Sequence, residues 1–116
     1  MNARRLAASI VLGLVASLLG ACTTSRVDER IAYWRAETAA HLPAGATRQQ
    51  AEAFFAARGT TLKCCTSQPP GPQMHFASER NVGRLLWAEY DVAVLVAFSP
   101  EQTVTSVKVE RWGVGL

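Results

Sequence analysis

Four residues in one stretch of the chain carry side chains that bind soft metals or exchange electrons. Cys64 and Cys65 are adjacent, and Met74 and His75 follow nine and ten residues after Cys65. Two thiolates, a thioether and an imidazole are ligands that suit Cu(I). In an oxidising compartment the cysteines can instead be oxidised or simply structural, although neighbouring side chains of a strand point to opposite faces. We therefore retain both hypotheses, a disulfide and a metal or redox site.

The same residues could in principle support hydrolysis, which needs a thiol nucleophile beside an imidazole base. The chain has only two histidines, His41 and His75, and the cysteines lie in a β-prone segment before a proline-rich loop. A Gly-x-Ser-x-Gly motif is absent from the sequence. We expect Glu89 and Asp91 to be solvated residues rather than a catalytic acid pair. The sequence therefore predicts a non-catalytic protein without a cofactor.

The first residues of the chain have the pattern of a secretory signal. Met1 to Arg5 carries two positive charges, and Leu6 to Leu19 is then fourteen residues without a charge. These lengths are typical of the basic and apolar regions of a signal peptide. The apolar run is shorter than the roughly 20 residues that a helix needs to cross a bilayer. We expect export rather than a membrane-spanning helix.

The remaining cysteine of the chain, Cys22, lies three residues after this segment. Leu19-Gly20-Ala21-Cys22 resembles a bacterial lipobox. The resemblance implies cleavage before Cys22, a thioether-linked diacylglycerol on its sulfur and acylation of the new amino terminus. Several acyl chains hold a protein on a bilayer effectively permanently. Thr23 follows, not aspartate, which by resemblance to the sorting rule of enteric bacteria implies the periplasmic face of the outer membrane.

Composition indicates one small domain and argues against a nucleic-acid partner. The chain has 116 residues, 49% hydrophobic and 18% charged, which is too apolar for a disordered protein. Without the first 21 residues, the chain has ten basic and nine acidic side chains. This balance lacks the basic surface that nucleic acids require. We divide the chain into a signal peptide at 1–21, a lipidated cysteine and tether at 22–26, and a single α+β domain at 27–116.

Two segments of the mature chain show the apolar spacing of amphipathic helices. The first runs from Val27 to Leu42 and ends before Pro43 and Gly45. The second begins at Thr47, which with Gln50 three residues later forms a capping-box pattern, and it ends at Gly59. The apolar residues expected to face the core are Val27, Ile31, Trp34, Ala51, Phe54 and Phe55.

After the second helix the apolar periodicity changes to two, which predicts strands. Helices followed by strands are typical of an α+β fold, here two N-terminal helices packed on a small antiparallel sheet of three to four strands. Alternating apolar residues on both faces of 92–99 predict that this strand is buried on both sides. The expected order is a strand at 60–67, a break at 68–72, a short strand at 73–78, a polar turn at 79–83, one or two strands over 84–99 with Asp91 as the potential break, a turn at 99–102 and a last strand at 103–112.

One segment of this pattern resembles a known family. Gly45 to Phe55 is similar to a motif of small secreted α+β lipoproteins, and strands with aromatic residues, here Trp87 and Tyr90, follow it. The chain from 27 to 112 thus resembles the SmpA/OmlA (BamE-like) class of outer-membrane lipoproteins, which implies two helices packed on a three-stranded antiparallel sheet. It also resembles inhibitor domains related to β-lactamase inhibitory protein, which implies inhibition of a periplasmic enzyme.

Aromatic residues are the remaining candidates for recognition. Of the three tryptophans, we expect Trp34 in the core and Trp112 to be the most exposed. Trp87, Tyr90 and Trp112 are candidate binding residues. We predict a lipid-anchored envelope protein with a structural or protein-binding role, through an exposed sheet face or the loop at 66–83. The alternatives are a soft-metal or redox module and a periplasmic enzyme inhibitor.

Overall fold

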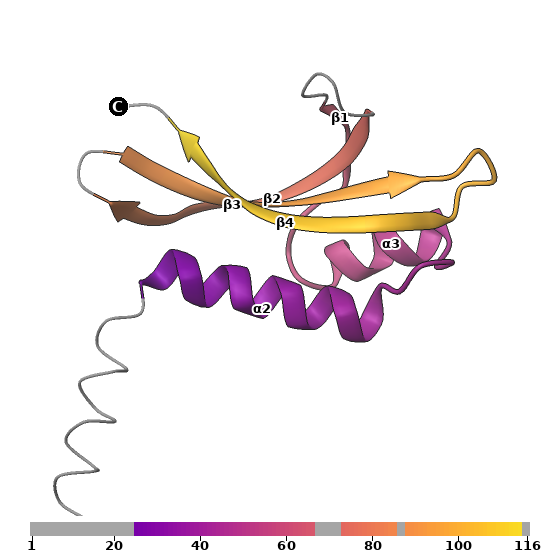
Figure 1. Cartoon of the computed structure of the whole chain (residues 1–116), viewed down its shortest axis with the longest axis horizontal. Helices are drawn as coiled ribbons and strands as arrows, with labels where there is room; N and C mark the ends of the chain where they lie inside the picture. Colours follow the sequence, from indigo (N-terminus) through magenta and orange to yellow (C-terminus); the bar gives the residue numbers. More distant parts are fainter. Residues whose placement is uncertain (1–24, 67–72, 86–87, 115–116) are drawn as a thin grey trace, which may run out of the picture.

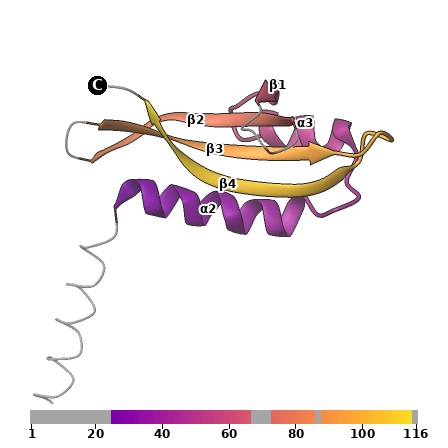
Figure 2. The ribbon, with the colours of Figure 1, turned by 45° about the horizontal axis from the view of Figure 1, so that its top comes forward.

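The structure is a computed structural model that describes residues 25–66, 73–85 and 88–114. The predicted fold class is confirmed, because two helices precede a four-stranded antiparallel sheet of order β1-β2-β3-β4. Both helices lie on the same face of the sheet, which leaves the other face uncovered by helices (Figures 1 and 2). The elements are α2 (Arg26–His41), α3 (Arg48–Ala56), β1 (Lys63–Thr66), β2 (Met74–Leu85), β3 (Ala88–Phe98) and β4 (Val104–Val114).

The helix boundaries follow the local signals of the sequence. Ser25 caps α2 by accepting the N–H of the third residue along. Thr47 and Gln50 form the predicted capping box, in which each side chain accepts the backbone N–H of the other, at 3.1 and 2.9 Å. Gly45 and Gly59, which follow the two helices, have φ of 93° and 79°, a conformation that favours glycine. The helices are therefore bounded by residues close to them in sequence.

The core lies between the helices and the sheet face that they cover. The indole of Trp34 packs against Phe54 and Phe55, with ring centroids 6.3 and 6.1 Å apart. Trp34 and Phe55 are 2% and 0% exposed, as expected for core residues. The prediction that the strand at 92–99 is buried on both sides is confirmed over 92–96 by a continuous buried run, whereas 97–99 are partly buried. The apolar members of this run are Val92, Ala93, Val94, Leu95 and Val96.

The expected polar turn at 79–83 is wrong. β2 runs through this segment to Leu85, with an irregularity in its pairing to β3 between Glu79 and Gly83. Asn81 adopts a φ of 55° there, and its N–H donates to the carboxylate of Asp91 at 2.9 Å. The chain accommodates the polar residues as a bulge because the neighbouring strand supplies an acceptor for this N–H.

Asp91 is also placed differently from the prediction. It lies inside β3 instead of breaking the strand, and it is 8% exposed instead of solvated. The sequence predicts that 84–90 belongs to the one or two strands that continue to 99. In the structure residues 84–85 belong to β2 and residues 88–90 to β3, and the two strands pair from Leu85 and Ala88 onwards. The sheet thus contains a long β2–β3 hairpin. The prolines of the predicted break at 68–72 lie outside the described residues.

Candidate functional site

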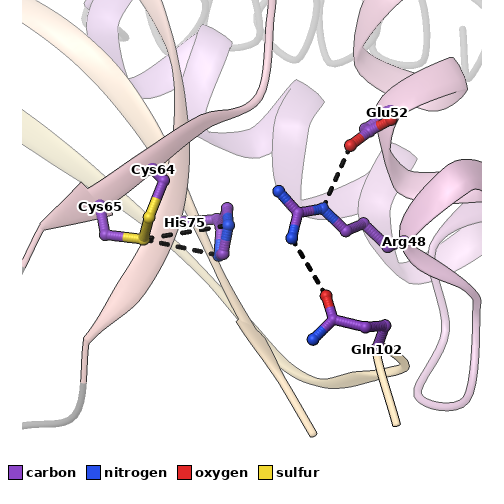
Figure 3. The surroundings of a disulfide bond; sticks show 6 residues. All are labelled: Arg48, Glu52, Cys64, Cys65, His75 and Gln102. Atoms are coloured by element: carbon purple, nitrogen blue, oxygen red, sulfur yellow. Dashed lines mark hydrogen bonds and ion pairs between the residues drawn. A yellow bond between two sulfur atoms is a disulfide. The ribbon is translucent and has the colours of Figure 1, made fainter. Parts of the chain in front are cut away.

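Three of the four predicted metal or redox residues lie together where β1 meets β2. Cys64 and Cys65 are joined by a disulfide, with their Cα atoms 3.1 Å apart. The Cys65 Sγ lies 3.8 Å from Nδ1 and 3.9 Å from Nε2 of His75. Figure 3 marks these two contacts with dashed lines. One donor atom from each of the three residues lies within 4.8 Å of the others. The pairing of β1 with β2 therefore assembles a Cys-Cys-His cluster.

The environment of His75 favours the neutral imidazole. Its ring makes an edge-to-face contact with Phe98 at a centroid distance of 5.1 Å. Partial burial, followed by the positive charge of Arg48, lowers the pKa of His75 below its usual value, while Glu52 opposes the shift. Arg48 is itself held by Glu52 at 3.2 Å and by the side-chain oxygen of Gln102 at 3.0 Å (Figure 3). A neutral imidazole has a lone pair to offer a metal or a proton.

Met74, the fourth predicted ligand, does not point toward the cluster. It is adjacent to His75 in β2, and successive side chains of a strand point to opposite faces of the sheet. His75 is opposite Val96, a core residue on the helix side. Met74 therefore belongs to the face away from the helices, and the cluster has two sulfurs and one imidazole.

The second histidine is not part of the cluster either. His41 lies at the end of α2, with its Nε2 3.7 Å from the carboxylate of Glu37. In the disulfide form neither Cys64 nor Cys65 has a thiolate, which is the form of cysteine that attacks a substrate or binds a metal. The chemistry open to the cluster is thus thiol–disulfide exchange and, after reduction, metal binding.

The predicted aromatic recognition residues do not form one patch. Trp112 is opposite Asp91 in the sheet, so Tyr90 next to it belongs to the opposite face. Trp112 is half-buried, contacts Phe76 at a centroid distance of 5.4 Å and donates its indole N–H to Glu110 at 2.7 Å. Tyr90 packs against the core on the helix side. Trp87 and Cys22, the residue predicted to be lipidated, lie outside the described residues.

A feature that the sequence analysis missed is the outer edge of β4. β4 is the last strand of the sheet, and the loop after α2 covers only its start, where Gly45 and Ala46 exchange hydrogen bonds with Val104 at 2.8 and 2.7 Å. From Ser106 onwards no described strand or loop pairs with this edge by backbone hydrogen bonds. Eleven residues of β4 thus form a long edge with one side open over most of its length.

A groove of about 550 Å³ runs between this edge and α2. Six consecutive residues of β4 contribute to it, although their side chains alternate between the two faces of the sheet. A groove on one face of the sheet would contact every second residue of the strand, so a groove lined by six consecutive residues follows the edge of the strand. Its lining consists of Arg35, Thr38, Ala39, Leu42, Pro43, Ala44 and the β4 residues 104–109.

Comparison of the chain with protein-family models, with curated proteins and with solved structures finds no match. None of the described helices is long and apolar enough to cross a membrane. Over the described residues, the fold and the site define a small α+β domain with a disulfide between adjacent cysteines and an open sheet edge at β4.

Proposed function

We propose that this protein is a lipid-anchored protein of the bacterial envelope that binds an extended segment of a partner protein along β4. Binding by strand addition uses the backbone N–H and C=O groups of an unpaired edge for affinity and pockets for alternate side chains for specificity. The observation that carries the proposal is the groove that follows the open edge of β4. The role is non-catalytic, and the partner supplies the missing strand.

The contrast between the two edges of the sheet supports this assignment. Proteins protect edge strands by making them short, by irregular pairing or by covering them. β1 is four residues long, and its pairing with β2 is irregular between Lys63 and Thr66. β4 has eleven residues and carries Val114, which is 42% exposed. The strand β1 is thus protected in two ways, while among the described residues most of β4 keeps the hydrogen-bonding groups of its outer side available.

The groove also indicates what kind of segment would bind. Its floor is apolar, with Leu42 and Val104 each 2% exposed, and the partly buried Val107 also lines the groove and packs against the same core. Arg35 lies along it as an exposed cation, whereas Lys108, also exposed, is paired with Glu110 at 3.2 Å. An extended segment with apolar residues at alternate positions and an acidic residue among them is complementary to this lining.

The proposed anchor would set where binding takes place. Cys22 precedes the first residue of α2 by four positions, and an extended chain spans at most about 3.6 Å per residue. The start of α2 would therefore lie within about 14 Å of the lipid attachment. The chain end of β4 lies at the same end of the domain as the start of α2 (Figure 1). A partner on β4 would be held near the membrane surface.

Site-specific photo-crosslinking in the organism that makes the protein tests the binding site. We expect a photoreactive residue at Ser106, in the groove, to give a partner adduct, whereas one at the exposed Glu29 on α2 gives none. Ala39→Arg places a long side chain in the groove and should abolish the adduct. Ala40→Arg makes the same change at the next exposed helix position, outside the groove, and should preserve it.

Equal adducts at the two probe positions, or an adduct that survives Ala39→Arg, would contradict strand addition at β4. The identity of the adduct separates two roles, because an enzyme as partner would favour the inhibitor hypothesis. The anchor is tested separately by Cys22→Ser, which should release the protein from membranes and remove the acyl mass from the mature chain. A Cys22→Ser protein that stays on membranes would refute the anchor and leave the binding site untouched.

A further inference from the structure

We propose that Cys64, Cys65 and His75 form a binding site for one Cu(I) ion that is closed by the disulfide and opened by its reduction. This inference does not rest on strand addition at β4. The Cys-Cys-His cluster lies at the opposite edge of the sheet, where β1 meets β2.

The positions of the donor atoms fit a single ion. Three donors that each lie about 2.0–2.3 Å from a metal in a trigonal plane are about 3.5–4.0 Å apart. The Cys65 Sγ already lies 3.8 and 3.9 Å from the two ring nitrogens of His75. All three donors lie within 4.8 Å of one another. After reduction, only the two sulfurs must move apart, and rotation of the side chain of the exposed Cys64 can supply that movement.

The identity of the donors favours Cu(I) over harder ions. Thiolates select soft metals such as Cu(I), and imidazole is compatible with copper. A structural zinc site takes four ligands, and Met74, the nearest further sulfur along β2, is on the opposite face. Within the described ranges, this is the only group of three Cys, His, Asp or Glu residues that is close enough to hold one ion. A three-coordinate soft ion is therefore the ligand that the cluster matches.

The gating step is a two-electron reduction by a dithiol. The thiolate of an external dithiol, either a protein with a reduced Cys pair or a small molecule, attacks one sulfur and breaks the Cys64–Cys65 bond. Its second thiol resolves the mixed disulfide, so the dithiol is oxidised to a disulfide and both cysteines become thiols. Cu(I) then displaces the two thiol protons and remains Cu(I), while His75 donates a ring nitrogen as a neutral ligand.

The charges around the cluster are compatible with this product. Two thiolates and one Cu(I) carry a net charge of −1. The guanidinium of Arg48 points toward His75 in Figure 3 and is held there by Glu52 and Gln102. This cation lies on the helix side of the cluster and, although Glu52 offsets part of its charge, it favours an anionic complex over the uncharged dithiol.

Anaerobic titration of the full-length protein in detergent micelles with Cu(I), against a chromogenic copper chelator, tests the proposal. We expect one Cu(I) per chain after reduction and none in the disulfide form. His75→Ala should weaken binding at least about tenfold. Mutation of residues that only hydrogen-bond to a metal ligand already lowers metal affinity about 10- to 100-fold, and His75 is itself a proposed ligand. His41→Ala is the matched control and should leave the affinity unchanged, as should Met74→Leu.

X-ray absorption at the copper edge provides a measurement that needs no variant. Two sulfur neighbours and one nitrogen neighbour are expected for the reduced wild-type protein. Three sulfur neighbours, or unchanged copper binding in the double variant Cys64→Ser/Cys65→Ser, would overturn the proposal. So would binding to the disulfide form, no binding after reduction, or equal affinities of the His75→Ala and wild-type proteins.

Discussion

Replacement of Gly83 by alanine should destabilise the protein through a single contact. Gly83 lies in β2, directly above the first turn of α2, and a Cβ added there would be 2.7 Å from Cγ2 of Val27. Carbon atoms prefer separations of about 3.5–4.0 Å, so the overlap is about 1 Å. Val27 is 1% exposed and β-branched, which leaves it little freedom to turn away.

The magnitude follows from two opposing effects. Overpacking a buried contact costs about 1–3 kcal/mol, whereas replacing a strand glycine by alanine gains about 0.5–1 kcal/mol. The difference spans about 0–2.5 kcal/mol, so we expect Gly83→Ala to lower the free energy of unfolding by a central value of about 1 kcal/mol. Val27→Ala removes the clashing atoms and costs about 1.6 kcal/mol for its two methyl groups, plus a cavity contribution. In the Val27→Ala background, Gly83→Ala should be neutral or stabilising by up to about 1 kcal/mol.

Urea unfolding of the four proteins, followed by far-UV circular dichroism, measures this double-mutant cycle. We expect the midpoints to change while the denaturant dependence stays constant, so that each difference reports stability. The two substitutions should be coupled favourably by about 1–3 kcal/mol. If Gly83→Ala costs the same with valine and with alanine at position 27, the contact with Val27 is not the cause and the close approach of β2 to α2 is wrong.

Three further predictions concern polar contacts, all measured by urea unfolding. Thr47→Ala should cost about 1 kcal/mol because it removes the cap of α3, and Thr47→Ser should restore most of that loss. Asp91→Ala should cost about 1–3 kcal/mol because it leaves the Asn81 N–H without its acceptor. Asp91→Asn keeps an oxygen that can accept this N–H and should cost less, so equal losses in the two variants would contradict this role. Arg30→Lys should cost about 0.2–1 kcal/mol, and less in high salt, because a lysine cannot form both hydrogen bonds of Arg30 to Glu79, at 2.6 and 2.8 Å.

The helices could be predicted because their boundaries depend on nearby residues. Thr47 and Gln50 are three positions apart and satisfy each other's backbone N–H without help from the rest of the chain. The glycine after α3 adopts a positive φ for the same local reason. Amphipathic spacing then identified Trp34 and Phe55, which are among the largest buried side chains. Signals of this kind survive in almost any tertiary environment.

The β2–β3 hairpin could not be predicted because the decisive interaction crosses strands. Asn81, Val82 and Gly83 have the composition of a turn, and Asn81 does adopt a positive φ. However, its N–H is satisfied by Asp91, ten residues away. With that bond the segment is a bulge within β2 and not a turn, so β2 continues to Leu85. A charged residue in the middle of an apolar strand was the only available signal, and it indicated a break.

The candidate metal site shows the same division between local and non-local information. Spacing along the chain correctly grouped Cys64, Cys65 and His75, because β2 begins only eight residues after β1 ends and pairs antiparallel with it. It could not decide between Met74 and His75, since only the pairing register determines which of two adjacent side chains faces the cysteines. β1 pairs irregularly, so alternation within β1 gives no reliable orientation for the two cysteines either.

The two proposed sites are separable because the meander places them at opposite edges of one sheet. β1 carries the cysteines, β4 carries the open edge, and three inter-strand spacings of about 4.8 Å put roughly 14 Å between them. β2 and β3, which lie between β1 and β4, pair along most of their length, and residues 92–96 of β3 are buried on both faces.

Coupling between two binding sites is reciprocal, and it requires an element with two arrangements whose equilibrium both ligands bias. Reduction of Cys64–Cys65 changes the middle of a four-residue strand at one edge of the sheet, whereas a partner on β4 would extend an existing ladder at the other. The physical expectation is therefore that Ala39→Arg blocks the partner without altering copper affinity, and that loss of the cysteines removes copper without altering the adduct at Ser106.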